Sequence, residues 1–371
     1  MFSREHMVVV VMLPIVAGCA ALDSPETDIP QEDCTLYGPI WNASMAEASV
    51  LYQDGGASFP VPGGAVWLFG DTFLGRLDAH GKPQYAGAAS CTTALWRDNA
   101  GTFPPALAYR AASDGKASSP FTYLPEESPE DYRIWPGGGL YLDGKTYVFY
   151  ELIHITGPGP WGFEGVAPGL ARGDEPLGPY TRLKPGGDWR FPIIAHQVIA
   201  ADGWLYLFQA AEWKGTRGVL MARVQPSDIE QPNAYHFYAG PGPRFTAERS
   251  ATELLVTNVY GQVSIAWNAY LGKYLMACSS DFSGHDEIRF RVAEHPWGPW
   301  GEPVRTVRVP ETQGPMQLVY CTYLHPKLFR DDGRTVVLTY CPMLEHGFAN
   351  PEMLELEWDA RPPKTAYEPL P

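Results

Sequence analysis

Short apolar strands that follow glycine-containing turns recur five times along this chain. Each copy begins with an extended segment, continues through a turn such as Asp143-Gly144 or Asp202-Gly203, and ends in an apolar run. Turns of this chemistry join the two strands of a tight β-hairpin. The apolar runs cover residues 65–69, 146–150, 204–208, 273–277 and 335–339.

The hairpins recur at intervals of about 60 to 80 residues without helical periodicity between them, which favours propeller blades. We predict an all-β fold, a five-bladed β-propeller of four-stranded blades. A β-sandwich is the rival, but sandwiches seldom show five similar hairpins at this interval. The last repeat lacks a fourth strand, so we expect residues 35–41 to supply it and close the ring, which removes two sheet edges. The expected innermost strands are 51–59, 134–142, 193–200, 261–268 and 322–329.

The first 19 residues have the layout of an export signal. An apolar run over 7–16 is too short for a stable membrane span, and it ends in Val16-Ala17-Gly18-Cys19, which resembles a bacterial lipoprotein box. An ordinary signal peptide with a chance cysteine is the alternative. We expect a lipidated Cys19, an acidic tether over 20–33 and a single propeller domain over 34–371. The protein would then be exported and lipid-anchored at the bacterial cell envelope, with the outer membrane or cell surface favoured.

The composition narrows the class of partner. A formal net charge of −15 argues against nucleic acid and other polyanions. Aromatic residues make up 13% of the chain, which suits stacking on sugar rings, although propeller strands also use them. We therefore expect a polysaccharide or oligosaccharide substrate, a membrane contact through the lipid only, a monomer and no cofactor.

The cysteines suggest disulfides rather than metal binding. Cys321 and Cys341 lie on the two arms of the fifth hairpin, where a cross-strand bridge could form in an exported protein. Cys34 could meet Cys91 if the N-terminal strand closes the ring, and Cys278 is expected to be free. No Cys-x-x-Cys motif or His/Cys cluster has zinc spacing, so no metal site is predicted.

Polar side chains near the starts of the innermost strands should converge on the mouth of the central channel. Asp54 is the only acid among them, although an acid before two glycines could also serve a turn. The expected substrate-binding residues are Trp135, His196, Gln197, Gln262, His325 and Lys327.

A second set of acids ends the apolar strands. Asp71, Glu151 and Glu212 are each candidates to pair with Asp54, because glycoside hydrolysis needs two carboxyls across the scissile bond. Asp71 could instead hydrogen-bond backbone amides of a neighbouring blade. Glu212, beside Trp213, suits a general acid in an apolar pocket, and Asp54 suits an ionised nucleophile or base. Retention or inversion depends on the carboxyl separation and is left open.

Two segments resemble a known family. Residues 53–58 (Gln-Asp-Gly-Gly-Ala-Ser) and 66–73 (Val-Trp-Leu-Phe-Gly-Asp-Thr-Phe) resemble the opening of the bacterial family called domain of unknown function 4185. Residues 323–328 resemble its His-Pro-Glu-Leu segment, and the similarity extends loosely over nearly the whole mature chain. The resemblance implies a five-bladed propeller and endo-acting D-arabinanase activity. It supports Asp54 and Asp71 as blade-one acids, and more weakly Glu151 and Glu212.

Two departures from that pattern bear on activity. Lys327 stands where the similar segment commonly has Glu, and Gly138 stands where an Asp is expected. We therefore expect an exported glycoside hydrolase that acts in endo mode on a furanoside-rich or other neutral polysaccharide, with a non-catalytic glycan-binding or scaffold lipoprotein as the alternative. A metal-requiring lyase or esterase is a weaker third option. A Ser/His/Asp hydrolase is poorly supported, because no Gly-x-Ser-x-Gly motif is present.

Overall fold

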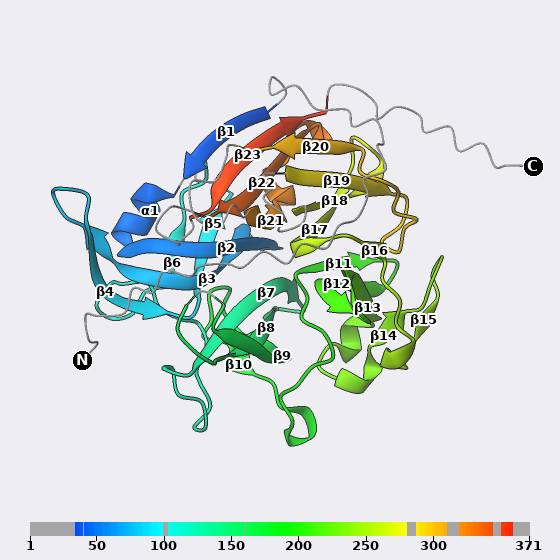
Figure 1. The fold of residues 1–371 in the computed structure, drawn as a ribbon, viewed down its shortest axis with the longest axis horizontal. Coiled ribbons are helices and arrows are strands. Elements are labelled where there is room, and N and C mark those ends of the chain that lie inside the picture. Colours follow the sequence, from blue (N-terminus) through cyan, green and yellow to red (C-terminus); the bar gives the residue numbers. More distant parts are fainter. Residues whose placement is uncertain are drawn as a thin grey trace, which may run out of the picture.

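The structure, a computed structural model, describes residues 34–39, 41–98, 103–159, 161–279, 287–309, 319–343 and 350–358. These residues form five antiparallel sheets arranged around a common centre (Figure 1). The predicted five-bladed propeller is confirmed. The predicted lipidation residue Cys19 and the tether lie outside the described residues. Within the described part, no helix is long and apolar enough to cross a membrane.

Each blade is a sheet of at least four strands, named from the centre outward. Blade 1 contains β2 (Val50–Val61), β3 (Gly64–Leu77), β5 (Thr92–Arg97) and β6 (Ala108–Tyr109), with β4 (Pro83–Ala89) paired to the second half of β3. Blade 2 contains β7 (Tyr132–Leu142), β8 (Lys145–Ile155), β9 (Phe163–Gly173) and β10 (Thr181–Arg182).

The remaining blades follow in chain order. Blade 3 contains β11 (Gln197–Ala201), β12 (Trp204–Trp213), β13 (Thr216–Val224) and β14 (His236–Tyr238), together with β15 (Phe245–Thr246) and β16 (Val256–Thr257). Blade 4 contains β17 (Tyr260–Asn268), β18 (Lys273–Ser279), β19 (Glu287–Ala293) and β20 (Arg305–Arg308). Blade 5 contains β21 (Val319–Leu324), β22 (Thr335–Pro342), β23 (Glu352–Glu357) and β1 (Cys34–Pro39).

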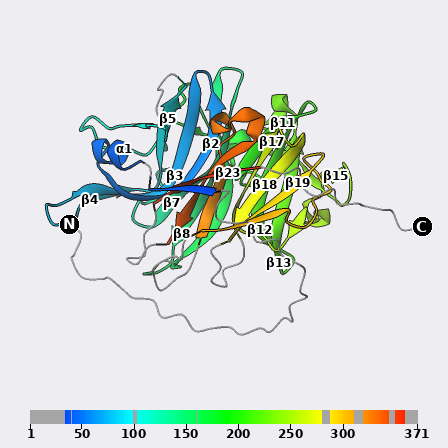
Figure 2. The same ribbon diagram turned by 90° about the horizontal axis from the view of Figure 1, so that it is seen from above.

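The N-terminal strand completes the last blade, as predicted. β1 pairs antiparallel with β23, from Cys34 opposite Leu356 to Pro39 opposite Glu352. The Tyr37 hydroxyl adds a hydrogen bond to Glu355 at 2.8 Å. The chain then enters a short helix, α1 (Asn42–Glu47), which lies beside β4 at one side of the molecule (Figures 1 and 2).

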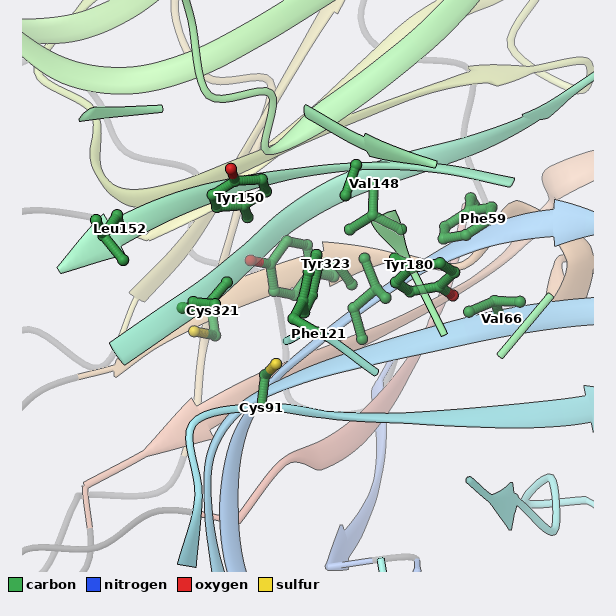
Figure 3. Close-up of a cluster of buried hydrophobic side chains, with 14 of the residues drawn as sticks. Phe59, Val66, Cys91, Phe121, Val148, Tyr150, Leu152, Tyr180, Cys321 and Tyr323 are labelled. Carbon is green, nitrogen blue, oxygen red and sulfur yellow. The ribbon is translucent and has the colours of Figure 1, made fainter. Parts of the chain in front are cut away.

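The apolar runs are continuous because both faces of each blade are covered. In β3, Val66 and Leu68 pack into a cluster shared with blade 2, which includes Val148. Trp67 and Phe69 point the other way and pack with Val337 of blade 5. Figure 3 shows the first of these clusters, in which side chains from β2, β3, β8 and β21 meet between blades. A strand buried on both faces reads as an unbroken apolar run.

Two of the expected innermost strands are displaced. β11 begins at Gln197, and β21 runs from Val319 to Leu324 instead of covering 322–329. In β21, Cys321 has a φ of 52°, and the pairing with β22 shifts register between Tyr320 and Tyr323. This bulge could not be read from alternation, because it uses a non-glycine residue in the left-handed region.

All five described cysteines are free thiols. Cys34 packs beside the blade 4 and 5 cluster, whereas Cys91 is buried in the cluster between blades 1, 2 and 5, so the predicted pairing of these two is wrong. The thiols of Cys321 and Cys341 are neighbours joined by a hydrogen bond, and burial raises the pKa of Cys321 well above its usual range. The bridge considered for this pair is not formed in the structure.

Candidate active site

A closed circle of contacts joins the beginnings of the innermost strands, one contact between each pair of neighbouring blades. Blade 1 meets blade 2 through Asp71 and Trp135, and blade 2 meets blade 3 through the Gly138 amide and the Ala195 carbonyl. The other three contacts are Ser264 to Gln197, the Cys321 amide to Gln262, and Tyr320 to Asp54. This circle brings residues of all five blades to one end of the propeller.

Backbone bulges in β2 place the Asp54 carboxyl across β3. The pairing of β2 with β3 shifts register on both sides of Gly55, and Gly55 and Gly56 have φ values of 87° and 105°. The Asp54 carboxyl then lies over Gly70, where a Cβ atom would overlap its Oδ1. Glycine at position 70 therefore makes room for the acid. The alternative in which Asp54 serves only a tight turn is wrong, since it lies within a strand.

Asp54 is held in surroundings that favour its protonated form. Burial and then the charge of Asp71 raise the pKa of Asp54 to about 7. The Tyr320 hydroxyl donates to Asp54 Oδ2 at 3.1 Å, and backbone amides of Asp71 and Asp54 also donate, all of which oppose the rise. Desolvation disfavours the charged form, while donated hydrogen bonds stabilise it. The net effect is a carboxyl that titrates near neutral pH.

The anion of Asp71 is supported by one hydrogen bond and by a nearby cation. The Trp135 indole N–H donates to Asp71 Oδ1 at 3.0 Å, and the positive charge of Arg133 lies nearby. Burial still raises the pKa of Asp71 above its usual range. Its contact with the neighbouring blade is made through the Trp135 side chain, not through the backbone amides considered from the sequence.

Two adjacent buried carboxyls cannot both ionise cheaply, so the pair retains one proton as pH approaches neutrality. The charge of Asp71 raises the pKa of Asp54, whereas the charge of Arg133 lowers the pKa of Asp71, so we assign the retained proton to Asp54. The sequence assigned Asp54 the ionised role, whereas its surroundings favour the protonated role.

Glu151 lies next to Trp135, the residue that donates to Asp71. It is the cross-strand neighbour of Trp135, and its carboxyl covers Gly165, where a Cβ would overlap it. Burial raises the pKa of Glu151. Among the described residues, its carboxyl has no hydrogen-bond or ion-pair partner.

The two predicted glutamines belong to the circle of contacts, and His196 stands in the chain between two of its members, Ala195 and Gln197. His196 Nδ1 accepts the Ala210 amide at 3.2 Å, so its Nε2 carries the hydrogen, and burial lowers the pKa of His196 to about 4. It is a neutral, half-buried donor. Gln197 and Gln262 each use their carbonyl oxygen to join two blades.

Three predicted site residues lie elsewhere. His325 is buried in the core: Nδ1 bonds Ser58 at 2.7 Å, Nε2 bonds Thr339 at 2.9 Å, and burial lowers its pKa to about 3. Its predicted contact with substrate is wrong. Lys327 lies in the 3-10 turn η6 (Pro326–Leu328) and pairs with Asp98.

The partner of Lys327 identifies which end of the propeller it occupies. The Asp98 amide bonds the Gly63 carbonyl in the β2–β3 turn, at the end of blade 1 opposite the acid pair. Lys327 therefore does not belong to the site.

Glu212 is exposed near the tip of the β12–β13 hairpin, opposite Arg217, with their charged atoms 3.9 Å apart. The apolar pocket expected around Glu212 is wrong. Gly138, the other departure from the family pattern, is explained by packing, because a Cβ there would lie 2.8 Å from the His196 carbonyl oxygen.

Sequence reasoning missed Tyr320 and Arg133. Tyr320 precedes the bulge at Cys321, so an inner strand started at 322 left it out. Arg133 stands two residues before Trp135 on β7 and could have been included as a strand-start cation. No group of three or more His, Cys, Asp or Glu residues in the described ranges could hold a metal ion.

The fold and the acid pair define a five-bladed propeller with a carboxyl site between its first, second and fifth blades. The family described as "Domain of unknown function (DUF4185)" matches residues 42–342, and the chain belongs to this family. No curated protein matches the chain.

Solved structures share the architecture at low sequence identity. A protein from Bacteroides ovatus ATCC 8483 has a TM-score of 0.58 and 16% identity over 90% of this chain and 96% of its own. A family 117 glycoside hydrolase from the marine bacterium Zobellia galactanivorans has a TM-score of 0.52 and 14% identity, over 88% and 90%. A GH43_1 enzyme from Xanthomonas citri has a TM-score of 0.50 and 14% identity, over 89% and 94%. At these identities the similarity shows the fold.

Proposed function

We propose that the protein is a glycoside hydrolase that cleaves within chains of a furanoside-rich, arabinan-like polysaccharide. The observation that carries this proposal is the Asp54–Asp71 pair, whose surroundings retain a proton near neutral pH. Family membership supports it, since the resemblance of residues 53–58 and 66–73 implies endo-D-arabinanase activity. Neighbours of the same fold include glycoside hydrolases.

The two carboxyls have different roles in glycoside cleavage. Protonated Asp54 gives its proton to the leaving oxygen as the glycosidic bond breaks. Ionised Asp71, held by Trp135, either attacks the anomeric carbon or takes a proton from the attacking water. His196 offers its Nε2–H to a substrate hydroxyl. NMR of the first-formed anomer distinguishes the two courses.

The non-catalytic alternative rested on Lys327 and Gly138. Lys327 lies at the opposite end of blade 1, and Gly138 is required by the close approach of blades 2 and 3. Neither departure removes a group from the acid pair, so both are compatible with hydrolysis.

Hydrolysis is tested by incubating the purified protein with D-arabinan, L-arabinan and an unrelated neutral glucan, and measuring new reducing ends and product lengths. We expect oligosaccharides from an arabinan and none from the glucan. Binding of an arabinan without new reducing ends over a long incubation would contradict the proposal and favour the glycan-binding alternative.

We also propose that the chain is exported and anchored to the cell envelope by lipid on Cys19, since Val16-Ala17-Gly18-Cys19 has the form of a lipoprotein box. Cys19→Ser should leave unprocessed precursor or release the protein from membranes. Fractionation with metabolic labelling by a fatty acid measures this. Unchanged partitioning and labelling would refute the anchor.

A further inference from the structure

Aromatic rings extend outward from the acid pair along blade 2. The indole of Trp135, which donates to Asp71, packs edge-on against Phe163, with ring centroids 4.8 Å apart. Phe163 in turn lies 6.3 Å from Trp161 at an interplanar angle of 34°. We call Trp135, Phe163 and Trp161 the aromatic row.

The row becomes more exposed with distance from the acids. Trp135 and Phe163 are half-buried, whereas Trp161 is 47% exposed. Trp161 lies in the loop of the β8–β9 hairpin, whose backbone bonds from Thr156 and Gly157 to Gly162 give it a compact form. An exposed ring of this size beside two further aromatic rings offers apolar surface on which a ligand can stack.

A polar group accompanies the rings. Glu151 faces Trp135 across the strand pair, and its half-buried carboxyl has no partner among the described residues. The Glu151 carboxyl therefore remains able to accept hydrogen bonds from a ligand. A sugar ring offers a partner to each of these groups. Its apolar C–H face stacks on an aromatic ring, and its hydroxyls donate hydrogen bonds to a carboxylate.

We propose that the aromatic row and Glu151 form a subsite that binds successive sugar rings of a neutral polysaccharide on the blade 2 side of the acid pair. This inference rests on the proposed function for the identity of the sugar, an arabinan. It accounts for endo action, because a chain held along the row extends past the acids and is cut internally.

The chain offers a matched control for the outermost ring. Trp267 is 50% exposed and contacts one neighbouring ring, Tyr274, edge-on at a centroid distance of 5.1 Å. It stands near the β17–β18 turn, at the end of blade 4 away from the circle of contacts. Trp267→Ala therefore removes an equally exposed indole without touching the row.

The first measurement is binding to D-arabinan and L-arabinan by calorimetry, in a protein that carries Asp54→Asn so that no cleavage intervenes. We expect Trp161→Ala to weaken binding by about tenfold or more, Trp161→Phe to retain most of the affinity, and Trp267→Ala to leave it unchanged. Circular dichroism confirms that each variant is folded.

The second measurement uses the otherwise wild-type enzyme. Trp161→Ala should raise KM on the polymer about tenfold while kcat on a short arabino-oligosaccharide stays the same. Equal polymer affinity of Trp161→Ala and its parent, an equal loss in Trp267→Ala, or no binding of either arabinan by the parent would overturn the subsite. Trp161-dependent binding without any hydrolysis by the wild type would instead refute only the proposed function.

Discussion

The proton on Asp54 is a consequence of where its carboxyl lies. Burial and the charge of Asp71 raise its pKa to about 7, against the opposing hydrogen bond from Tyr320. An acid with a raised folded-state pKa binds more protons folded than unfolded, so its contribution to stability falls as pH rises toward 7. Above that pH, where Asp54 is ionised, its burial lowers the free energy of unfolding.

Replacing either acid tests the pair directly. Asp54→Asn and Asp71→Asn should each lower turnover on the polymer by about a hundredfold or more, the scale of acid–base catalysis. Neither should lower the thermal midpoint at pH 8, because Asn removes a charge that the folded state disfavours. Reducing-end assays and thermal unfolding provide the measurements.

The exposed Glu212 is the comparison for these variants. Glu212→Gln should leave turnover within about twofold of wild type, since this side chain faces solvent beside Arg217. A hundredfold loss in Glu212→Gln, with full activity in Asp71→Asn, would restore the assignment made from sequence.

Tyr320 controls the pH at which Asp54 loses its proton. The Tyr320 hydroxyl stabilises the Asp54 anion, so Tyr320→Phe removes that help and raises the pKa of Asp54. The alkaline limb of the kcat–pH profile should move upward, by up to about one unit for the loss of a single hydrogen bond. A downward shift, or an unchanged limb with lower kcat throughout, would show that Tyr320 does not act through Asp54.

Sequence reasoning assigned Asp54, Asp71 and Trp135 to one candidate site because they stand at strand positions that local patterns identify, and in the structure they lie together. It misplaced Glu212 because a neighbouring Trp says nothing about the side of a hairpin that a carboxyl occupies. It misplaced His325 because both of its nitrogen partners, Ser58 and Thr339, belong to other strands. Ser58 belongs to blade 1 and Thr339 to β22 of blade 5, and no local pattern encodes contacts with strands that are this distant in the chain.

At the scale of the element, the close approach of β2 and β3 determines whether the acid fits. A Cβ at Gly55 would lie 2.9 Å from the Gly70 amide nitrogen, and a Cβ at Gly70 would overlap Asp54. The two strands are therefore closer here than side chains allow. The acid occupies the space that glycine leaves.

Gly70→Ala should displace Asp54 and abolish most activity while destabilising the fold by about 1–3 kcal/mol, as overpacking does. Gly301→Ala is the control, because a Cβ there meets nothing within 4 Å and no positive φ is required. Enzyme assays and denaturant unfolding of both variants measure the effect. Full activity in Gly70→Ala would mean that the carboxyl does not need its position over β3.

The five hairpins could be predicted because turn chemistry and apolar runs are local. Asp143 and Asp202 adopt the positive φ that such turns require. The start of β21 could not be predicted, because its bulge places Cys321 in a conformation that its residue type disfavours. Because the predicted strand began after this bulge, Tyr320 was not included in the predicted site.

For the whole molecule, closure of the ring depends on one short strand. β1 covers the edge of β23, and Leu36 packs beside the blade 4 and 5 cluster. Counting strands in the sequence predicted this closure, because the last repeat was one strand short.

A chain that begins at Trp41 should therefore have a thermal midpoint lower by more than about 5 °C than one that begins at Cys34, and should aggregate through the open edge. Thermal unfolding and light scattering of the two chains test this. Equal midpoints would show that β1 contributes nothing to the closed ring.

The same closure sets the order in which the candidate site can form. Tyr37 and Glu355, which hydrogen-bond across β1 and β23, are 318 positions apart, so a chain made from its N-terminus holds its first strand unpaired until its last blade emerges. Tyr320, which holds Asp54, belongs to that last blade as well. A nascent chain that lacks blade 5 thus carries both acids but not Tyr320, so the proposed activity would appear only when the whole propeller has been made and folded.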